Sequence, residues 1–293
     1  MRKVLKKTMS VVLAASLLAG SVGAVDAAEV KSKSVRRGNA DYVSNQGELI
    51  TTPFVQLPVG AVRANGWLEN QLLLQKVNLT GNMHLFNDYN EATSAWLGAE
   101  NGESWERGPY YMRGLVALAY VLDDEDLKSE AQMWVEAILK SQREDGSFGA
   151  GSKTDWWAKM PVLMAMRDYY EATEAAGEPD ERVLPFMESY FRYQQAALPN
   201  NHLSNWADAR GGDNIDSVYW LYNRVYDEAD PQTSDWLLDL GNILEEQTTD
   251  WTGQYNDTTV RQHVVNTSQG MKTPAVYYQY SKNELDKNAL QNG

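Results

Sequence analysis

Four segments of the chain share one pattern, in which a polar and aromatic cluster is followed by a largely apolar run. Their starts, at Pro109, Trp156, Asn214 and His263, lie roughly fifty residues apart, a spacing found among repeats of helix pairs. The helices expected after these starts cover residues 110–122, 157–173, 214–226 and 263–280. The first of them is apolar on nearly every side, which is typical of a buried helix.

Amphipathic segments alternate with these buried ones. They cover residues 126–142, 181–197 and 233–246, and the partner of the fourth buried helix is scarcely present. An inner row of buried helices with an outer row of half-exposed ones predicts an all-α fold, an incomplete (α/α)6 toroid built from helix pairs. We expect this partial α/α-barrel domain to cover residues 49–293.

The region before the first pair is less regular. Residues 67–77 carry apolar side chains near one stripe and predict a first helix. Residues 80–104 are rich in Asn, Gly and Glu and predict a long loop with one short helical turn at most. Loops of that length inside a domain are usually functional.

The N-terminal residues have the composition of an export signal. Four basic residues precede an apolar run over residues 11–19 and a small-residue stretch that ends at Ala27. This order predicts a signal peptide over residues 1–27, cleaved near Ala27, and therefore a secreted protein. Residues 28–48 are polar and aperiodic, and we expect a flexible leader there. No later segment reaches the length of a membrane-spanning helix, so no membrane partner is expected.

Composition narrows the class of partner. Removing residues 1–27 takes away four basic residues and one acidic residue, which changes the net charge from −14 to −17. A charge of that sign repels nucleic acid and anionic lipid. The sequence has no cysteine, so these residues supply no thiol nucleophile and no thiolate ligand. Ten Trp and sixteen Tyr favour a carbohydrate partner, because flat amphipathic rings suit the apolar faces of sugars.

Several motifs in one order resemble a known family. They are PFVQLPVGAVRANGWLENQLLLQKVNLTG, SWERGPYYMRGLVALAYVLDDEDL, WWAKMPVLMAMRDYYEAT, RVLPFMESYFRYQ, RGGDNIDSVYWLYN and HVVNTSQGMKTPAVYYQYSKNE. Residues 53–284 resemble the amino-terminal part of glycoside hydrolase family 127, the β-L-arabinofuranosidase-like enzymes. The resemblance implies an (α/α)6 barrel and the hydrolysis of terminal sugars of plant-type glycans with retention.

The same resemblance implies a zinc-bound cysteine nucleophile and a glutamate acid/base in later barrel helices, downstream of residues 263–280. None of these residues has a counterpart here, so zinc is expected only in a downstream part. No pair of His or carboxylate residues stands at an i, i+4 ligand spacing with a third group nearby, so we expect no metal site. We expect the 293 residues alone to hydrolyse nothing.

Candidates for a sugar-binding wall stand at the starts of the four inner helices, which we expect at one end of the barrel. They are Trp105, Glu106, Trp156, Trp157, Asp213, Asn214, His263 and Gln269. Each has a plainer interpretation. The tryptophans could be core residues, Asp213 a helix cap, Glu106 a carboxylate favoured by a helix dipole, and His263 a structural histidine.

Three hypotheses for function remain open. The first is part of a secreted glycoside hydrolase, and the second is a saccharide-binding protein without catalysis. The third is a polysaccharide lyase, in which His263 and Tyr278 would be the suspected groups. The acidic charge of the chain disfavours the lyase, because acidic polymers require a basic cleft.

Overall fold

The structure, a computed structural model, describes residues 43–257 and 263–292. Within those ranges the regular structure is helical, with no strand and a single isolated bridge between Ser94 and Glu103. The prediction of an all-α fold is confirmed. The predicted signal peptide over residues 1–27 and the first part of the expected leader lie outside the described residues. All described helices belong to one compact unit.

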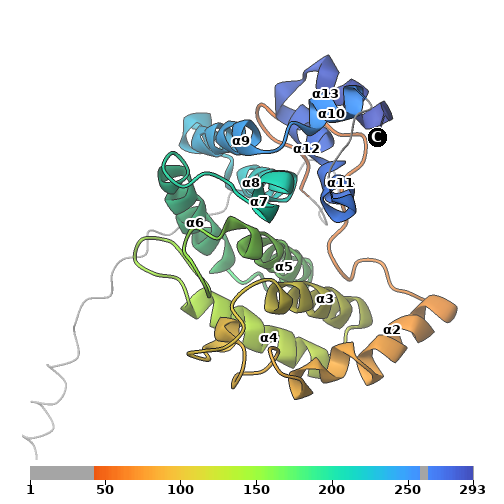
Figure 1. Cartoon of the computed structure of the whole chain (residues 1–293). Coiled ribbons are helices and arrows are strands. Elements are labelled where there is room, and N and C mark those ends of the chain that lie inside the picture. Colours follow the sequence, from red (N-terminus) through yellow and green to blue (C-terminus); the bar gives the residue numbers. More distant parts are fainter. Residues whose placement is uncertain (1–42, 258–262, 293) are drawn as a thin grey trace, which may run out of the picture. The chain divides into compact units, whose positions relative to one another are not determined.

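Four helices succeed one another as an inner row (Figure 1). They are α3 (Arg107–Leu122), α5 (Trp156–Ala175), α8 (Gly211–Val225) and α12 (Thr273–Ser281). Helix α5 packs against α3 and α8, and α8 packs against α12. Fifteen of the twenty residues of α5 are buried, which makes it the central helix of the core.

An outer helix follows each inner one. These are α4 (Glu125–Lys140), α6 (Val183–Ala197), α9 (Asp235–Gln247) and α13 (Glu284–Asn292), and each packs against the inner helix before it. In α4 the buried residues Leu127, Ala131, Trp134, Val135 and Ile138 form one stripe, as the amphipathic pattern predicts. The partner of the fourth inner helix, which the sequence leaves nearly absent, is therefore present as α13.

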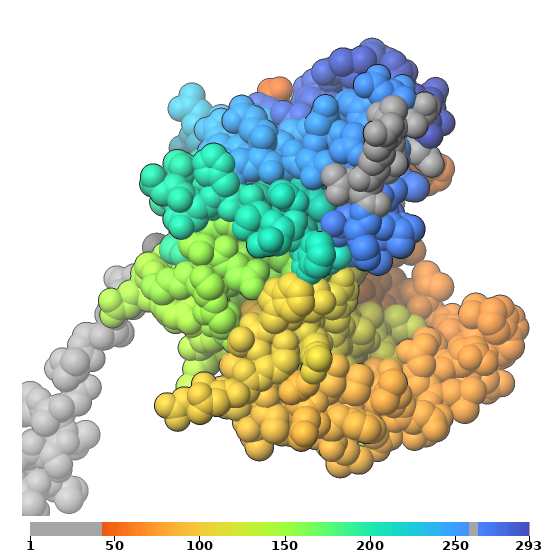
Figure 2. Space-filling view, in the orientation of Figure 1, coloured from red at the N-terminus to blue at the C-terminus, as the bar shows by residue number. Residues whose placement is uncertain are grey.

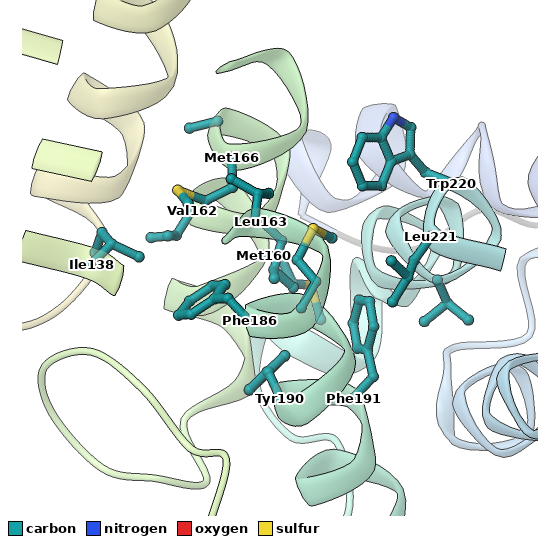
Figure 3. Packing of buried hydrophobic residues seen from close by; sticks show 14 of the residues in the cluster. Ile138, Met160, Val162, Leu163, Met166, Phe186, Tyr190, Phe191, Trp220 and Leu221 are labelled. Carbon is teal, nitrogen blue, oxygen red and sulfur yellow. The ribbon is translucent and has the colours of Figure 1, made fainter. Parts of the chain in front are cut away.

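The centre of the core lies around α5 (Figure 3). Methionine and aliphatic side chains of α5 pack between α4 on one side and the aromatic residues of α6 on the other. The residues that show this packing are Ile138, Met160, Val162, Leu163, Met166, Phe186, Tyr190 and Phe191. Close packing of this kind holds α5 in one position, and α5 in turn positions the tryptophans at its start.

Shorter elements complete the fold. The predicted first helix is α2 (Trp67–Val77), and the predicted loop after it contains two 3-10 helices, η1 (Thr80–Leu85) and η2 (Ala95–Leu97). Three further elements were not predicted. They are α7 (Trp206–Ala209), η3 (Pro231–Thr233) and α10 (Trp251–Asn256).

The prediction of one helix over residues 263–280 is wrong. The segment forms two helices, α11 (Val264–Gly270) and α12, with Met271 and Lys272 between them. Pro274 stands in the first turn of α12. Proline has no N–H for the hydrogen bond of a continuing helix, but it is tolerated where a helix starts.

Residues 43–48, which the sequence places in the leader, are attached to the helical core. Asn45 donates to Gln279 Oε1 at 2.8 Å, and the backbone N–H of Gln46 donates to Asn223 Oδ1 at 2.9 Å. The Gln46 side chain is buried. The packed part of the chain therefore includes these residues as well as the expected domain from residue 49.

Candidate functional site

A pocket rich in tryptophan lies at the start of α5. Its volume is about 540 Å³, within the usual range for small-molecule sites. Four indoles and five small polar or acidic residues line it, namely Trp105, Trp156, Trp157, Trp206, Ser152, Thr154, Asp155, Ser204 and Asn205. Apolar ring faces with a polar rim are a surface suited to a molecule that has both apolar faces and hydroxyl groups.

The starts of the inner helices are linked by side-chain contacts around this pocket. Glu106, just before α3, accepts a hydrogen bond of 2.6 Å from Trp157 Nε1 of α5. The Arg210 guanidinium, just before α8, lies 4.1 Å from the centre of the Trp157 indole. Arg210 Nε donates to Asn266 Oδ1 of α11 at 3.1 Å. These contacts link the starts of α3, α5 and α8 with α11.

Glu106 and Trp157 form the centre of the arrangement. The Glu106 carboxylate is partly exposed, whereas the Trp157 indole is buried. Glu106 also lines a neighbouring pocket of about 400 Å³ with Arg107 and Tyr110. The Tyr110 ring meets Trp157 edge to face at 5.8 Å. Glu106 therefore lines this second pocket and not the tryptophan pocket, to which it is linked through Trp157.

Trp105 and Trp156 differ in exposure although both line the pocket. Trp105 is 41% exposed. Trp156 is almost fully buried, and its Nε1 donates to the Asn201 carbonyl at 2.9 Å. Trp105 is therefore the indole that a ligand reaches most easily, and Trp156 acts largely as a core residue.

Asn205 and Trp206 form the opposite wall. Asn205 has a φ of 57° with a ψ of −121°, a conformation that residues other than glycine rarely adopt. Strain of this kind occurs more often at functional sites than elsewhere. Trp206 follows it at the start of α7, and its ring lies 6.3 Å from the ring of His263. His263 is exposed and occupies the N-cap position of α11 without a side-chain capping hydrogen bond, and it does not line the pocket.

Lys159 fixes the wall that contains Ser152 and Asp155. Its side chain is fully buried in α5, and Nζ donates to the carbonyls of Ser152 at 2.8 Å and Asp155 at 2.9 Å. Burial lowers the pKa of Lys159 to about 8. The buried ammonium thus positions two residues of the pocket without contacting a ligand.

Asp213 and Asn214 do not line the pocket. Asp213 is buried in the first turn of α8 and forms an ion pair with Lys272, so it does not serve as the cap of that helix. Burial raises the pKa of Asp213, and Lys272 opposes that shift. Asn214 is fully buried and donates to Gln194 of α6 at 2.8 Å, away from the pocket.

Gln269, the last predicted site residue, lies in the final turn of α11 and does not line the pocket. Its Oε1 is buried and has no hydrogen-bond partner among the described residues. Three residues around the pocket that the sequence did not single out are Trp206, Arg210 and Asn266. Arg210 stands directly before the Gly-Gly-Asp run, so its position next to a predicted helix start was the available signal.

The residues of the described ranges offer no metal centre. No group of three or more His, Cys, Asp or Glu side chains in them could hold a metal ion. The zinc that the family resemblance implies does not fit these residues, and no step is assigned to it.

Comparison with family models, curated proteins and solved structures finds no match to this chain. None of the helices in the described part is long and apolar enough to cross a membrane.

Proposed function

We propose that this chain is the saccharide-binding part of a secreted glycoside hydrolase of the β-L-arabinofuranosidase type. The observation that carries the proposal is the tryptophan pocket, which four indoles line and in which Trp105 is exposed. The row of inner helices with its outer partners is consistent with an arc of an α/α toroid, and we include that architecture in the proposal.

The pocket suits a sugar for two reasons. Indole rings present flat apolar faces, against which the C–H face of a pyranose or furanose ring can stack. The rim residues Ser152, Thr154 and Ser204 offer hydroxyl and backbone groups to sugar hydroxyls. Glu106 lines the neighbouring pocket, where its carboxylate can accept a hydrogen bond from a hydroxyl of a longer saccharide.

Hydrolysis needs a second group across the glycosidic bond. A retaining glycosidase uses two groups on either side of that bond, about 5 Å apart in the usual dicarboxylate form. Asp155 lines the same pocket as Trp157, but it stands at the cap of α5 and neither carboxylate is assigned a catalytic role. We therefore propose ligand binding for these residues, with hydrolysis left to residues that the family has in later helices.

A matched pair of tryptophan variants tests sugar binding. Trp105→Ala removes an exposed indole of the pocket, and Trp67→Ala removes an exposed indole of α2 that lies outside it. We expect Trp105→Ala to weaken the binding of L-arabinose oligosaccharides about fivefold, because a stacked ring contributes about 1 kcal/mol. Trp67→Ala should leave the dissociation constant unchanged. Calorimetric titration measures both.

An assay for released L-arabinose accompanies the titration. Binding without release of L-arabinose agrees with the proposal for this chain. Release of L-arabinose by the purified 293 residues would show that they contain a catalytic pair, contrary to our proposal. Equal affinity in both tryptophan variants and the unsubstituted chain would exclude the pocket as the sugar site.

A further inference from the structure

Arg210 is buried beside the tryptophan pocket without an ionic partner. Its side chain belongs to the segment between α7 and α8 and is only 6% exposed. The guanidinium lies 4.1 Å from the Trp157 ring centre and 5.6 Å from that of Trp206, two indoles that line the pocket. Within residues 43–257 and 263–292 no carboxylate stands within ion-pair distance of it.

Two other arginines of low exposure among the described residues are paired. Arg167 donates to Asp216 at 2.6 Å, and Arg224 donates to Glu171 at 3.2 Å. A charge removed from water is costly unless an opposite charge or a set of hydrogen bonds accompanies it. The Arg210 side chain contacts the ring of Trp157 and the side-chain amide of Asn266, and neither carries a negative charge that would balance the guanidinium.

The orientation of Arg210 leaves its outer edge available. Nε donates to the buried Asn266, which fixes the plane of the guanidinium while it stacks on Trp157. In the described ranges no hydrogen-bond acceptor is found for Nη1 or Nη2. Two adjacent N–H groups in a rigid fork match the two oxygens of a carboxylate.

Glu106 and Arg210 contact the same indole in different ways. Glu106 accepts from the Nε1 edge of Trp157, and Arg210 lies over the ring. Neither residue lines the tryptophan pocket itself, but both contact an indole that does, so an acceptor and a cation stand at separate positions next to it. That polarity orients a ligand that carries hydroxyl groups and one negative charge.

We propose that the tryptophan pocket accepts an acidic sugar, a uronic acid whose carboxylate pairs with the Nη groups of Arg210. The inference rests on the proposed saccharide-binding function and specifies its substrate class. Because the whole chain carries a net charge of −14, its general field does not attract an anion. The preference for a carboxylate comes from Arg210 alone.

Sugar pairs that differ only at C6 test the inference. Galacturonic acid and galactose form one such pair, and glucuronic acid and glucose form another. We expect the uronic acid of at least one pair to bind about tenfold more tightly than its neutral counterpart, because a charge-assisted hydrogen bond exceeds a neutral one by that amount. Raising the salt concentration should reduce the ratio.

Variants of Arg210 locate the effect. Arg210→Gln should bring the two affinities of a pair within about twofold of each other. Arg210→Lys keeps the charge without the fork and should retain part of the preference. Arg192→Gln is the matched control. The guanidinium of Arg192, in α6, also stacks on an indole, 3.5 Å from the ring centre of Trp236 in α9.

The outcomes separate this inference from the function on which it rests. If neutral sugars bind and neither uronic acid binds more tightly, Arg210 does not select a carboxylate, although the saccharide site stands. If no sugar of either kind binds, the proposed function fails. If Arg210→Gln does not fold, the ratio in the unsubstituted chain and in Arg210→Lys still decides, because a ratio near one in both overturns the inference.

Discussion

Lys159 shows how one residue links the core to the pocket. A fully buried lysine is uncommon, and this one, near the start of α5, has two backbone carbonyls as partners. Those carbonyls belong to Ser152 and Asp155, which line the pocket. Burying the Lys159 ammonium costs some stability at neutral pH, while its two hydrogen bonds hold the pocket wall in place.

Replacing Lys159 by Met should therefore have an effect that depends on pH. The pKa of Lys159 is about 8 in the folded chain, below the ordinary value of 10.5, so the unfolded chain binds more protons between these values. Stability from this group is full above pH 10.5 and is lost as the pH falls through 8. We expect the free energy of unfolding, relative to Lys159→Met, to rise by about 2 kcal/mol between pH 7 and pH 9.5.

Urea unfolding at the two pH values measures that difference. Comparison with the variant cancels the titration of other groups, since they are common to both chains. Lys140→Met, at an exposed position near the end of α4, provides the control and should show no change with pH. If the free energies of unfolding of the unsubstituted chain and Lys159→Met differ by the same amount at both pH values, Lys159 is not buried as an ammonium.

At the scale of elements, the junction of α9 with α13 carries unbalanced acidic charge. Burial raises the pKa of Glu245 in α9 to about 7, and Asp286 and Asp250 add to the shift. Asp286, in α13, accepts from Thr252 at 2.7 Å and from Ser281 at 2.5 Å. Among the described residues, the buried Oε2 of Glu245 has no hydrogen-bond partner.

Glu245→Gln should stabilise the chain above neutral pH. The folded Glu245 carboxyl keeps its proton up to about pH 7, whereas the unfolded one loses it near 4.5. The contribution of Glu245 to the stability of the unsubstituted chain is therefore full below pH 4.5 and lost as the pH rises through 7. We expect the variant to gain about 2 kcal/mol at pH 8 and little at pH 5. Glu246→Gln, at the adjacent exposed position, should change neither value. A larger gain at pH 5 would contradict the assignment.

The order of long helices could be predicted from the sequence because each has a clear apolar period. Residues 67–77 form a helix with the predicted bounds, and buried helices alternate with half-exposed ones as expected. Helices α7 and α10 have four and six residues, too few for a period to show. The break between α11 and α12 depends on Pro274, whose effect a count of apolar residues does not register.

The candidate site was predicted in part for related reasons. Glu106 and Trp157 were found because they begin regular helices. Trp206 and Arg210 were missed because they lie in and directly after the four-residue α7. Asp213 and Asn214 were placed at the site by their position at a helix start, but Asp213 pairs with Lys272 and Asn214 with Gln194, partners that the sequence pattern does not show.

At the scale of the whole molecule, the most unusual feature is apolar surface at two places. Helix α2 buries none of its residues, and its exposed apolar side chains continue into the segment after it, the orange surface of Figure 2. The exposed residues there are Trp67, Leu68, Leu73, Leu74, Val77, Leu79, Leu85 and Phe86. Val264, Val265, Met271, Leu285 and Leu290 form a second exposed apolar set on α11 to α13. Soluble monomers seldom expose so much contiguous apolar surface.

We expect the purified chain to self-associate through α2, and two adjacent leucines allow a direct test. Leu74 is 52% exposed, whereas Leu72 packs against the core. Leu74→Glu should lower self-association in sedimentation and change the free energy of unfolding by less than about 0.5 kcal/mol, because the side chain loses few contacts. Leu72→Glu should destabilise the chain and increase aggregation, because it buries a charge. A chain that is monomeric at every concentration, with both variants behaving alike, would show that the apolar face of α2 does not drive association.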